Sequence, residues 1–202
     1  MVVKYSYKKD KDKKISSNFS VYEFRSVYGQ ELTTDDIFVD NILIKKLEAL
    51  KMALNASKAI ITSGYRNKEC DLLVGGTGNG QHCLGKASDV MFYDKDGNII
   101  DTKYISCVAQ EIGFNGIARI SNTSIHLDVR DGKRYLGDET KSTNTVTKDF
   151  YEYYKINRLE TLKKLVKENA CFADETIDFL CTYKYSEDLL KKILLFCVDK
   201  IY

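Results

Sequence analysis

The sequence predicts an α+β fold, in which a small antiparallel sheet with flanking helices is followed by a helical C-terminal segment. Three patterns support this prediction: short apolar runs typical of strands, helix-period stretches between them, and purely helical periodicity after residue 150. Hydrophobic residues make up 44% of the 202 residues and charged residues 30%, so the chain can bury a core. The length suits one domain with a small appendage.

The first half of the chain predicts an alternation of helix and strand. Residues 1–15 are rich in lysine, and we expect them to be a flexible basic leader. SSNFSVYEFRS, residues 16–26, is typical of a capped short helix that aromatic residues anchor to a core. Apolar positions recur at helical spacing over residues 35–54, and AIITSGY (59–65) predicts a strand. A glycine-rich loop, residues 74–82, then leads to the first histidine.

The next segments predict the rest of the sheet. KASDVMFY (86–93) is expected to be a strand, and the DKDG turn joins it to a second strand, NIID (98–101). Residues 101–112 have a helical pattern. GFNGIARI (113–120) and SIHLDVR (124–130) predict two more strands, joined by a polar turn.

The composition changes after residue 137. Residues 138–149 are polar and are expected to be a linker, whereas residues 150–202 have apolar positions at helical spacing. We therefore divide the chain into the leader, a domain over residues 16–137, the linker and a helical C-terminal segment. The aromatic residues of that segment suit core packing or a partner surface, and packing is favoured. Its candidate N-caps are Asn157, Asp174 and Ser186.

Charge, hydropathy and cysteine content exclude several classes of protein. The formal net charge of +2, without a long basic stripe, does not favour nucleic-acid binding. No apolar run approaches the roughly 20 residues of a membrane span, and the charged start has no signal peptide. The six cysteines form no CxxC pair, which argues against a thiolate zinc knuckle. We expect reduced thiols in a protein made in the cytoplasm.

The two histidines of the chain, His82 and His126, lie in segments that indicate one divided metal site, together with Asp89. Two imidazoles and a carboxylate leave one zinc position open for water, as in catalytic rather than structural sites. Alternation along residues 124–130 places His126 and Asp128 on one polar face of a strand. An ordinary amphipathic strand would show the same alternation, and the ligand set would also accept other divalent ions.

Together these segments resemble the zinc D-Ala-D-Ala peptidase family, which includes D,D-carboxypeptidases, vancomycin-resistance dipeptidases and phage endolysins. The shared elements are SGYR, VGG, QH followed by GKASD, and HLDVR after GFNGI, in the family's order and spacing. The resemblance covers about residues 15–137, and the lead SNFSVYEFRS is similar to that of the carboxypeptidase and endolysin branch. It implies a fold like that of Hedgehog domains and D,D-peptidases.

The resemblance also implies roles for individual residues. The zinc ligands would be His82, Asp89 and His126. Arg66 would hold the substrate's carboxylate or polarise the scissile carbonyl, since its planar guanidinium suits either task. A surface ion pair of Arg66 with Glu69 or Asp71 is the alternative. Further substrate-binding residues would be Tyr65 and Gln81.

The general base departs from the family pattern. Many relatives place a carboxylate three residues before the second histidine, where this chain has Thr123. Asp128 is the candidate base in its place, and a role in orienting a ligand or Arg130 is the alternative. Gly80 replaces a serine that relatives often have just before QH, which removes one expected hydrogen bond to the substrate.

The expected function is a zinc-dependent peptidase that hydrolyses peptidoglycan stem or cross-link peptides, as a D-Ala-D-Ala carboxypeptidase or an endolysin-type endopeptidase. It would act at the cell wall after release in phage or prophage lysis, or be carried in a virion, with the C-terminal helices binding the wall or a protein partner. The alternative is a catalytically inactive zinc module, for example in a phage tail, which Thr123 supports. A cysteine peptidase that uses Cys83 is a third possibility.

Overall fold

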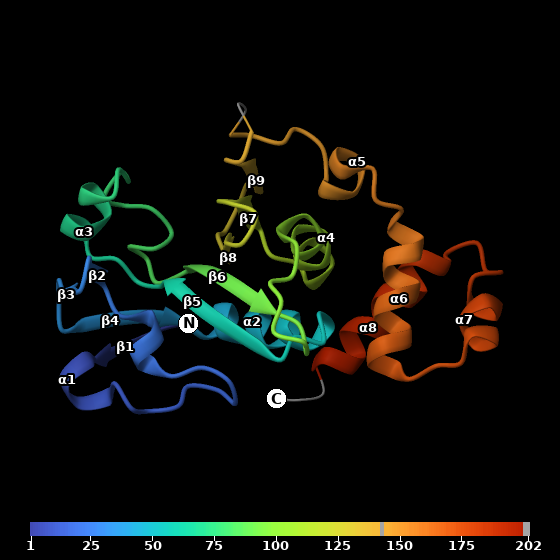
Figure 1. Ribbon diagram of the computed structural model, residues 1–202, viewed down its shortest axis with the longest axis horizontal. Coiled ribbons are helices and arrows are strands. Elements are labelled where there is room, and N and C mark those ends of the chain that lie inside the picture. Colours follow the sequence, from blue (N-terminus) through green and yellow to red (C-terminus); the bar gives the residue numbers. More distant parts are fainter. Residues whose placement is uncertain (142–143, 200–202) are drawn as a thin grey trace.

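A five-stranded sheet, with strand order β5-β6-β8-β7-β9, forms the centre of the computed structural model, which describes residues 1–141 and 144–199 (Figure 1). Neighbouring strands run antiparallel, except that β7 and β9 are parallel. The predicted α+β class is confirmed. The sheet differs from the predicted antiparallel one in that β9 pairs in parallel with β7. The strands are β5 (Lys58–Ser63), β6 (Ala87–Tyr93), β7 (Gly116–Arg119), β8 (Ile125–Asp128) and β9 (Tyr135–Asp138).

Two helices of the first domain pack behind this sheet. The helix predicted over residues 101–112 is confirmed as α4 (Thr102–Ile112), which contacts β7 and β8. The helix predicted over residues 35–54 begins later, as α2 (Asn41–Ala53), because the preceding residues form β4 (Asp36–Asp40). Asp40 is the last residue of β4. Its side chain caps α2 by accepting a hydrogen bond from the Ile42 backbone N–H, at 2.7 Å.

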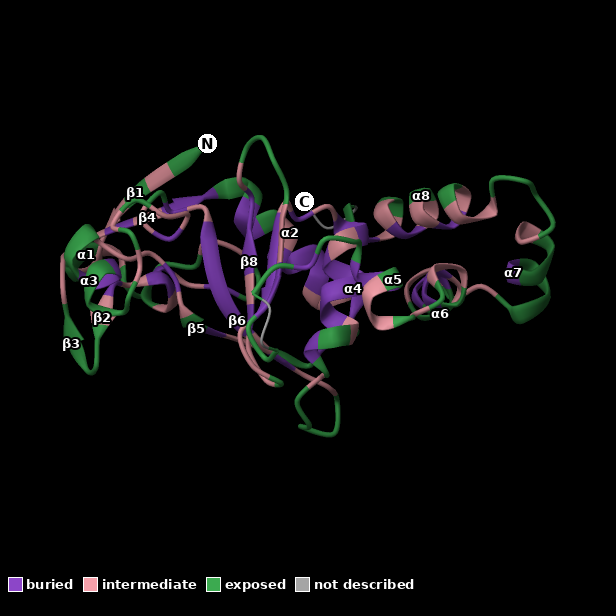
Figure 2. Cartoon of the chain, turned by 90° about the horizontal axis from the view of Figure 1, so that it is seen from above, coloured by how far each residue is buried: buried purple, intermediate pink, exposed green. Residues whose placement is uncertain are grey.

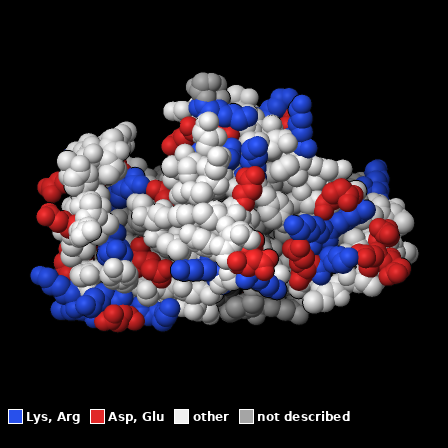
Figure 3. All heavy atoms as spheres, in the orientation of Figure 1, with Lys and Arg blue, Asp and Glu red and all other residues white. Residues whose placement is uncertain are grey.

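The N-terminal residues belong to the fold, which differs from the predicted flexible leader. Strand β1 (Val2–Ser6) pairs antiparallel with β4 along its whole length, and α1 (Tyr7–Asp10) follows directly. The lysines of this stretch gather at one end of the molecule, over β1 and α1 (Figure 3). The short helix predicted in residues 16–26 is the 3-10 turn η1 (Val21–Phe24), and the hairpin β2 (Val27–Tyr28) and β3 (Glu31–Leu32) comes next.

Two boundaries near the sheet differ from the prediction. NIID does not form a strand, since it contributes a single bridge between Tyr93 and Ile99. Strand β9 spans the predicted domain boundary, and its last residue, Asp138, is fully buried against Arg119, 3.2 Å away. Val146 in the predicted linker is also buried. Residues 142–143 of the linker, and residues 200–202 of the predicted helical segment, lie outside the described residues.

The C-terminal segment is helical, as predicted, and lies at the opposite end of the molecule from β1 (Figure 1). Helices α6 and α8 pack on each other and on α2 through buried leucines, so packing explains their apolar faces (Figure 2). Asn157 caps α6 as predicted, whereas Ala173 holds the cap position of α7. The described helices include none that is long and apolar enough to cross a membrane. The segment comprises α5 (Phe150–Tyr154), α6 (Arg158–Ala170), α7 (Asp174–Leu180) and α8 (Ser186–Asp199).

Candidate metal centre

The register of the sheet brings two of the predicted ligands together. Asp89 on β6 and His126 on β8 are direct cross-strand partners. Side chains of directly paired residues point to the same face of a sheet, so the carboxylate and the imidazole lie side by side. The Asp89 Oδ1 atom is 3.0 Å from His126 Nδ1. Two of the three candidate ligands are thus held on the hydrogen-bonded backbone of neighbouring strands.

His82 completes the group from the turn that precedes β6. Its Nδ1 is 2.7 Å from the carbonyl oxygen of Gly64, so the Nδ1–H donates there and Nε2 is left as an acceptor toward the site. Nε2 lies 3.1 Å from His126 Nδ1 and 3.3 Å from Asp89 Oδ1. Gly64 itself packs closely against the backbone of η1, since a Cβ at its position would be 2.5 Å from the Cα of Phe24.

The geometry of these three atoms fits a metal ion. Their separations are 3.0, 3.1 and 3.3 Å. Ligand atoms about 2.0–2.1 Å from a tetrahedral zinc ion are roughly 3.3 Å apart, which is close to the observed triangle. His82 and Asp89 are buried and His126 is partly buried. Each histidine also has its other ring nitrogen occupied by a protein acceptor, which fixes the ring for metal binding.

Electrostatics favour a cation at the triangle. Burial raises the pKa of Asp89, but its contacts with His126 and His82 outweigh burial and hold that pKa well below its usual range. Burial lowers the pKa of His126, but hydrogen bonds to Asp128 and Asp89 raise it to about 9. Two carboxylates around one imidazole therefore attract positive charge, and a metal ion competes with a proton at His126.

Asp128 holds the far side of His126. The His126 Nε2–H donates to Asp128 Oδ2 at 3.1 Å, and the backbone N–H of Arg130 donates to Oδ1 at 3.0 Å. The guanidinium of Arg130 also binds the carboxylate, with Nε 2.9 Å from Oδ1. The side chain is fully buried, so both oxygens are committed within the protein. These contacts favour the orienting role over the role of general base.

Arg66 is positioned by three side chains at the cavity wall. One NH2 group is 2.7 Å from Asp89 Oδ2, and Nε donates to the Ser63 hydroxyl at 2.9 Å. Nη1 is 3.5 Å from Asp71 Oδ1, so Arg66 does pair with Asp71, although Asp71 is buried and the pair is not the surface ion pair predicted as the alternative. Asp71 is buried and also accepts a hydrogen bond from the Gly78 backbone N–H at 2.8 Å. Arg66 thus contacts the candidate ligand Asp89 and, through Asp71, the glycine-rich loop.

A cavity of about 410 Å³ opens beside the triangle. Figure 3 shows the surface hollowed between the part that carries α3 (Lys68–Leu73) and the part that carries β7 and β9. One wall is the loop after α3, and the other comes from β7, β9 and the residues that follow them. The lining residues are Arg66, Val74, Gly75, Gly76, His82, Asp89, Ala118, Ile120, His126, Tyr135 and Glu139.

Two lining residues with polar side chains, Tyr135 and Glu139, were not predicted, and the two predicted substrate-binding residues Tyr65 and Gln81 are not among the lining residues. Tyr135 and Glu139 belong to β9 and its extension, where the alternation in RYLGDE was the available signal. The Tyr65 ring packs 5.2 Å from the Phe38 ring and is not among the lining residues. Gln81 is also not among them, and its buried Oε1 has no hydrogen-bond partner in the described part of the chain.

The cysteine-peptidase alternative has little support in the structure. Burial and the nearby Asp71 carboxylate raise the pKa of the Cys83 thiol, which opposes the thiolate that a cysteine peptidase needs. Thr123 lies in the turn before β8, and its hydroxyl is 3.1 Å from that of Ser121. All six cysteines are free.

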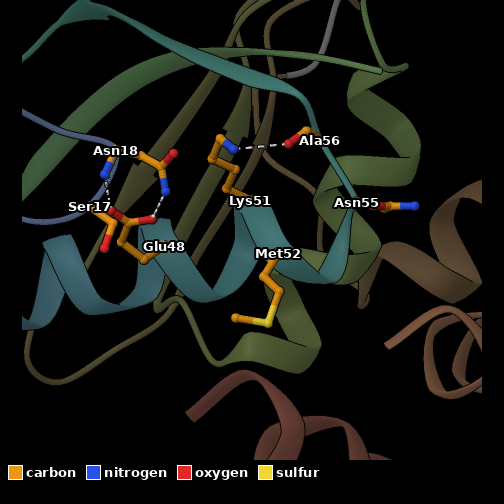
Figure 4. Close-up of a pocket in the computed structure, with 7 residues that line it drawn as sticks. All are labelled: Ser17, Asn18, Glu48, Lys51, Met52, Asn55 and Ala56. Atoms are coloured by element: carbon orange, nitrogen blue, oxygen red, sulfur yellow. Dashed lines mark hydrogen bonds between the residues drawn. The ribbon is translucent and has the colours of Figure 1, made fainter. Parts of the chain in front are cut away.

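A second depression, on α2, offers no comparable chemistry (Figure 4). Its carboxylate, Glu48, accepts hydrogen bonds from the backbone and side-chain amides of Asn18, at 2.7 and 2.5 Å. Lys51 donates to the carbonyl oxygen of Ala56 at 3.0 Å. Glu48 and Lys51 therefore both have hydrogen-bond partners within the protein. The depression is explained by the packing of the segment that contains Asn18 on α2.

The comparisons with known proteins agree with the metal centre. A family model described as Peptidase M15 matches residues 18–128, more than half of the chain. The match runs from the segment before η1 to the end of β8, so it includes the three ligands and Arg66. No curated protein matches the chain. Strand β9 and the C-terminal helices lie beyond the matched region.

Proposed function

Because the chain belongs to the Peptidase M15 family, we propose that it is a zinc-dependent peptidase that hydrolyses peptidoglycan stem or cross-link peptides. The observation that carries the proposal is the triangle of His82, Asp89 and His126, whose atoms have the spacing of zinc ligands and border an open cavity. The peptidoglycan substrate comes from the resemblance of the motifs.

The residues around the triangle have distinct tasks in this reaction. When bound, zinc supplies a Lewis acid that polarises a carbonyl and lowers the pKa of water to about 7. Asp128 holds the His126 ring so that Nδ1 faces the cavity. Asp71 and Ser63 hold the Arg66 guanidinium at the cavity wall. The remaining donors of Arg66 suit the oxygen of the scissile carbonyl or the terminal carboxylate of the substrate.

These two uses of Arg66 correspond to two kinds of peptidase. A D-Ala-D-Ala carboxypeptidase binds the free carboxylate of a stem peptide and releases single D-alanine. An endolysin-type endopeptidase cuts within the stem or cross-link and releases larger fragments. The masses of the released products therefore distinguish the two directly.

The test is hydrolysis of purified peptidoglycan by the full chain, followed as loss of turbidity and by mass spectrometry of the released peptides. We expect cleavage that stops with a chelator, returns with zinc, and is lost in His82→Ala. Glu31→Gln is the control, because Glu31 is exposed on β3 and is not among the residues that line the cavity. Cleavage that continues after the metal has been removed would refute the proposal.

A catalytically inactive zinc module is the second candidate. It is favoured by Thr123, which stands where relatives have a carboxylate, and by Asp128, whose oxygens are already engaged. A protein that holds one zinc per chain and leaves all peptidoglycan peptides intact would support this candidate over the peptidase.

We also propose that the C-terminal helices bind the cell wall or a protein partner, so that the enzyme acts at the wall after phage or prophage lysis or from a virion. The support is a cluster of exposed aromatic side chains on α7 and the turn after it, Phe179, Tyr183 and Tyr185. The test is cosedimentation with purified peptidoglycan, in which Tyr183→Ala with Tyr185→Ala should lower the bound fraction. Equal binding by the variant and the wild type would contradict wall binding by this surface.

A further inference from the structure

Strand β9 presents polar side chains to the cavity beside the triangle. It forms one edge of the sheet, whereas Arg66 follows β5 at the other edge. Alternate residues of a strand share a face, so Tyr135, Gly137 and Glu139 point one way. Leu136 packs against the core, and Asp138 binds Arg119, which places both on the other face. The cavity lining includes Tyr135 and Glu139, as this alternation requires.

Gly137 lets the two side chains approach each other. A Cβ at Gly137 would lie 2.6 Å from the Tyr135 hydroxyl, so the phenol crosses a space that only glycine leaves free. Burial raises the pKa of Tyr135, and the negative charge of Glu139 adds to the rise. Both side chains line the same cavity.

The backbone of Glu139 is fixed although its side chain is exposed. Its N–H donates to the carbonyl oxygen of Arg119 at 2.8 Å, which continues the pairing of β9 with β7. The preceding residue, Asp138, is held by Arg119 and accepts a hydrogen bond from the Tyr154 hydroxyl at 2.6 Å. Glu139 thus extends from a rigid strand end into the cavity.

The other carboxylates near the triangle are already engaged. Asp89 is a ligand, and Asp128 is buried against His126. Asp71 is buried and binds Arg66 and the backbone of Gly78. The Glu139 carboxylate lines the same cavity and forms no hydrogen bond or ion pair with the residues that the structure describes.

We propose that Glu139 is the general base of the peptidase reaction. It would replace the carboxylate that many relatives have at the position of Thr123. This role rests on the proposed function. Glu139 takes one proton from water while the water oxygen bonds to the carbonyl carbon. The C–N bond then breaks as the nitrogen takes that proton from Glu139, which gives a carboxylic acid and an amine and returns Glu139 to the carboxylate.

The test compares Glu139→Gln with the wild type in three measurements: peptidoglycan hydrolysis, zinc affinity, and calorimetric binding of solubilised muropeptides. We expect hydrolysis to fall about 10²–10⁴-fold, the range for loss of a general base. Zinc affinity should stay within about twofold of the wild-type value, and muropeptides should bind uncleaved, because glutamine keeps the size of the side chain. Glu31→Gln, at an exposed position on β3, is the matched control and is expected to behave as the wild type.

Two results would overturn the role of Glu139. Wild-type hydrolysis by Glu139→Gln would show that the base lies elsewhere, and a zinc affinity at least about tenfold weaker would make Glu139 part of the metal site instead. Failure of the proposed function has a different signature, since the wild type itself would then cleave no peptidoglycan peptide.

Discussion

Replacing Asp128 by asparagine separates the two roles considered for this residue. The carboxylate accepts the His126 Nε2–H at 3.1 Å and binds the backbone and guanidinium of Arg130. Asparagine has nearly the same shape but no charge, and only one of its two terminal atoms accepts. The variant therefore weakens the support of the His126 ring without opening a large cavity.

The expected size of the effect follows from that contact. A hydrogen bond to a charged group contributes about 1.5–3 kcal/mol, and each 1.36 kcal/mol corresponds to a factor of ten. Loss of the group that orients a metal ligand lowers metal affinity about 10–100-fold, which agrees with this range. We therefore expect Asp128→Asn to raise the zinc Kd about 10–100-fold and to regain most of its hydrolysis rate at saturating zinc.

The assay is a competition titration of zinc against a chromogenic chelator, followed by hydrolysis at saturating zinc. Asp131→Asn is the matched control, because Asp131 is 91% exposed and pairs only with Lys86 among the described residues. The reasoning is refuted if Asp128→Asn binds zinc like the wild type but hydrolyses more than about 100-fold more slowly, the signature of a lost general base.

Two further predictions concern packing and pH. Gly116→Ala would place a Cβ 1.9 Å from Asp128 Oδ2, so we expect about 1–3 kcal/mol of destabilisation in urea unfolding and weaker zinc binding. Gly80→Ala, which meets nothing within 4 Å, is the control, and equal stability of both variants would contradict the prediction. Burial raises the pKa of Glu111, but hydrogen bonds from Arg158 outweigh burial and lower it. A lowered pKa stabilises the fold above the unfolded value near 4.3 and stops doing so as the pH falls. The difference in urea midpoint between the wild type and Glu111→Gln should therefore be largest at pH 7 and shrink below about pH 4, and a difference independent of pH would contradict this account.

The sequence predicted three candidate ligands that the structure brings together, because local patterns contain them. His82, Asp89 and His126 stand in recognisable motifs, and period-two alternation assigns His126 and Asp128 to one strand face. The pairing of Asp89 opposite His126 depends on the register between β6 and β8, which the sequence does not state. The sequence also left open whether Asp128 acts as a base or orients a ligand. The structure favours the orienting role, because both carboxylate oxygens are engaged by His126 and Arg130.

The parts that sequence did not predict depend on contacts between distant segments. Strand β1 forms because residues 2–6 pair with residues 36–40, and a stretch with many lysines shows little sign of this by itself. Strand β9 has four residues and pairs in parallel with β7, a pairing that the local pattern does not indicate, so Glu139 falls in the predicted linker. Buried Asp138, paired with Arg119, is what attaches that segment to the sheet.

The metal content of the purified chain tests the central claim most directly. Elemental mass spectrometry after equilibration with zinc and removal of unbound metal should give one zinc per wild-type chain. The same measurement should give essentially none in Asp89→Ala or His126→Ala, with both variants shown to be folded by circular dichroism. Full zinc occupancy in those folded variants, or none in the wild type, would contradict the assignment of His82, Asp89 and His126 as the metal centre.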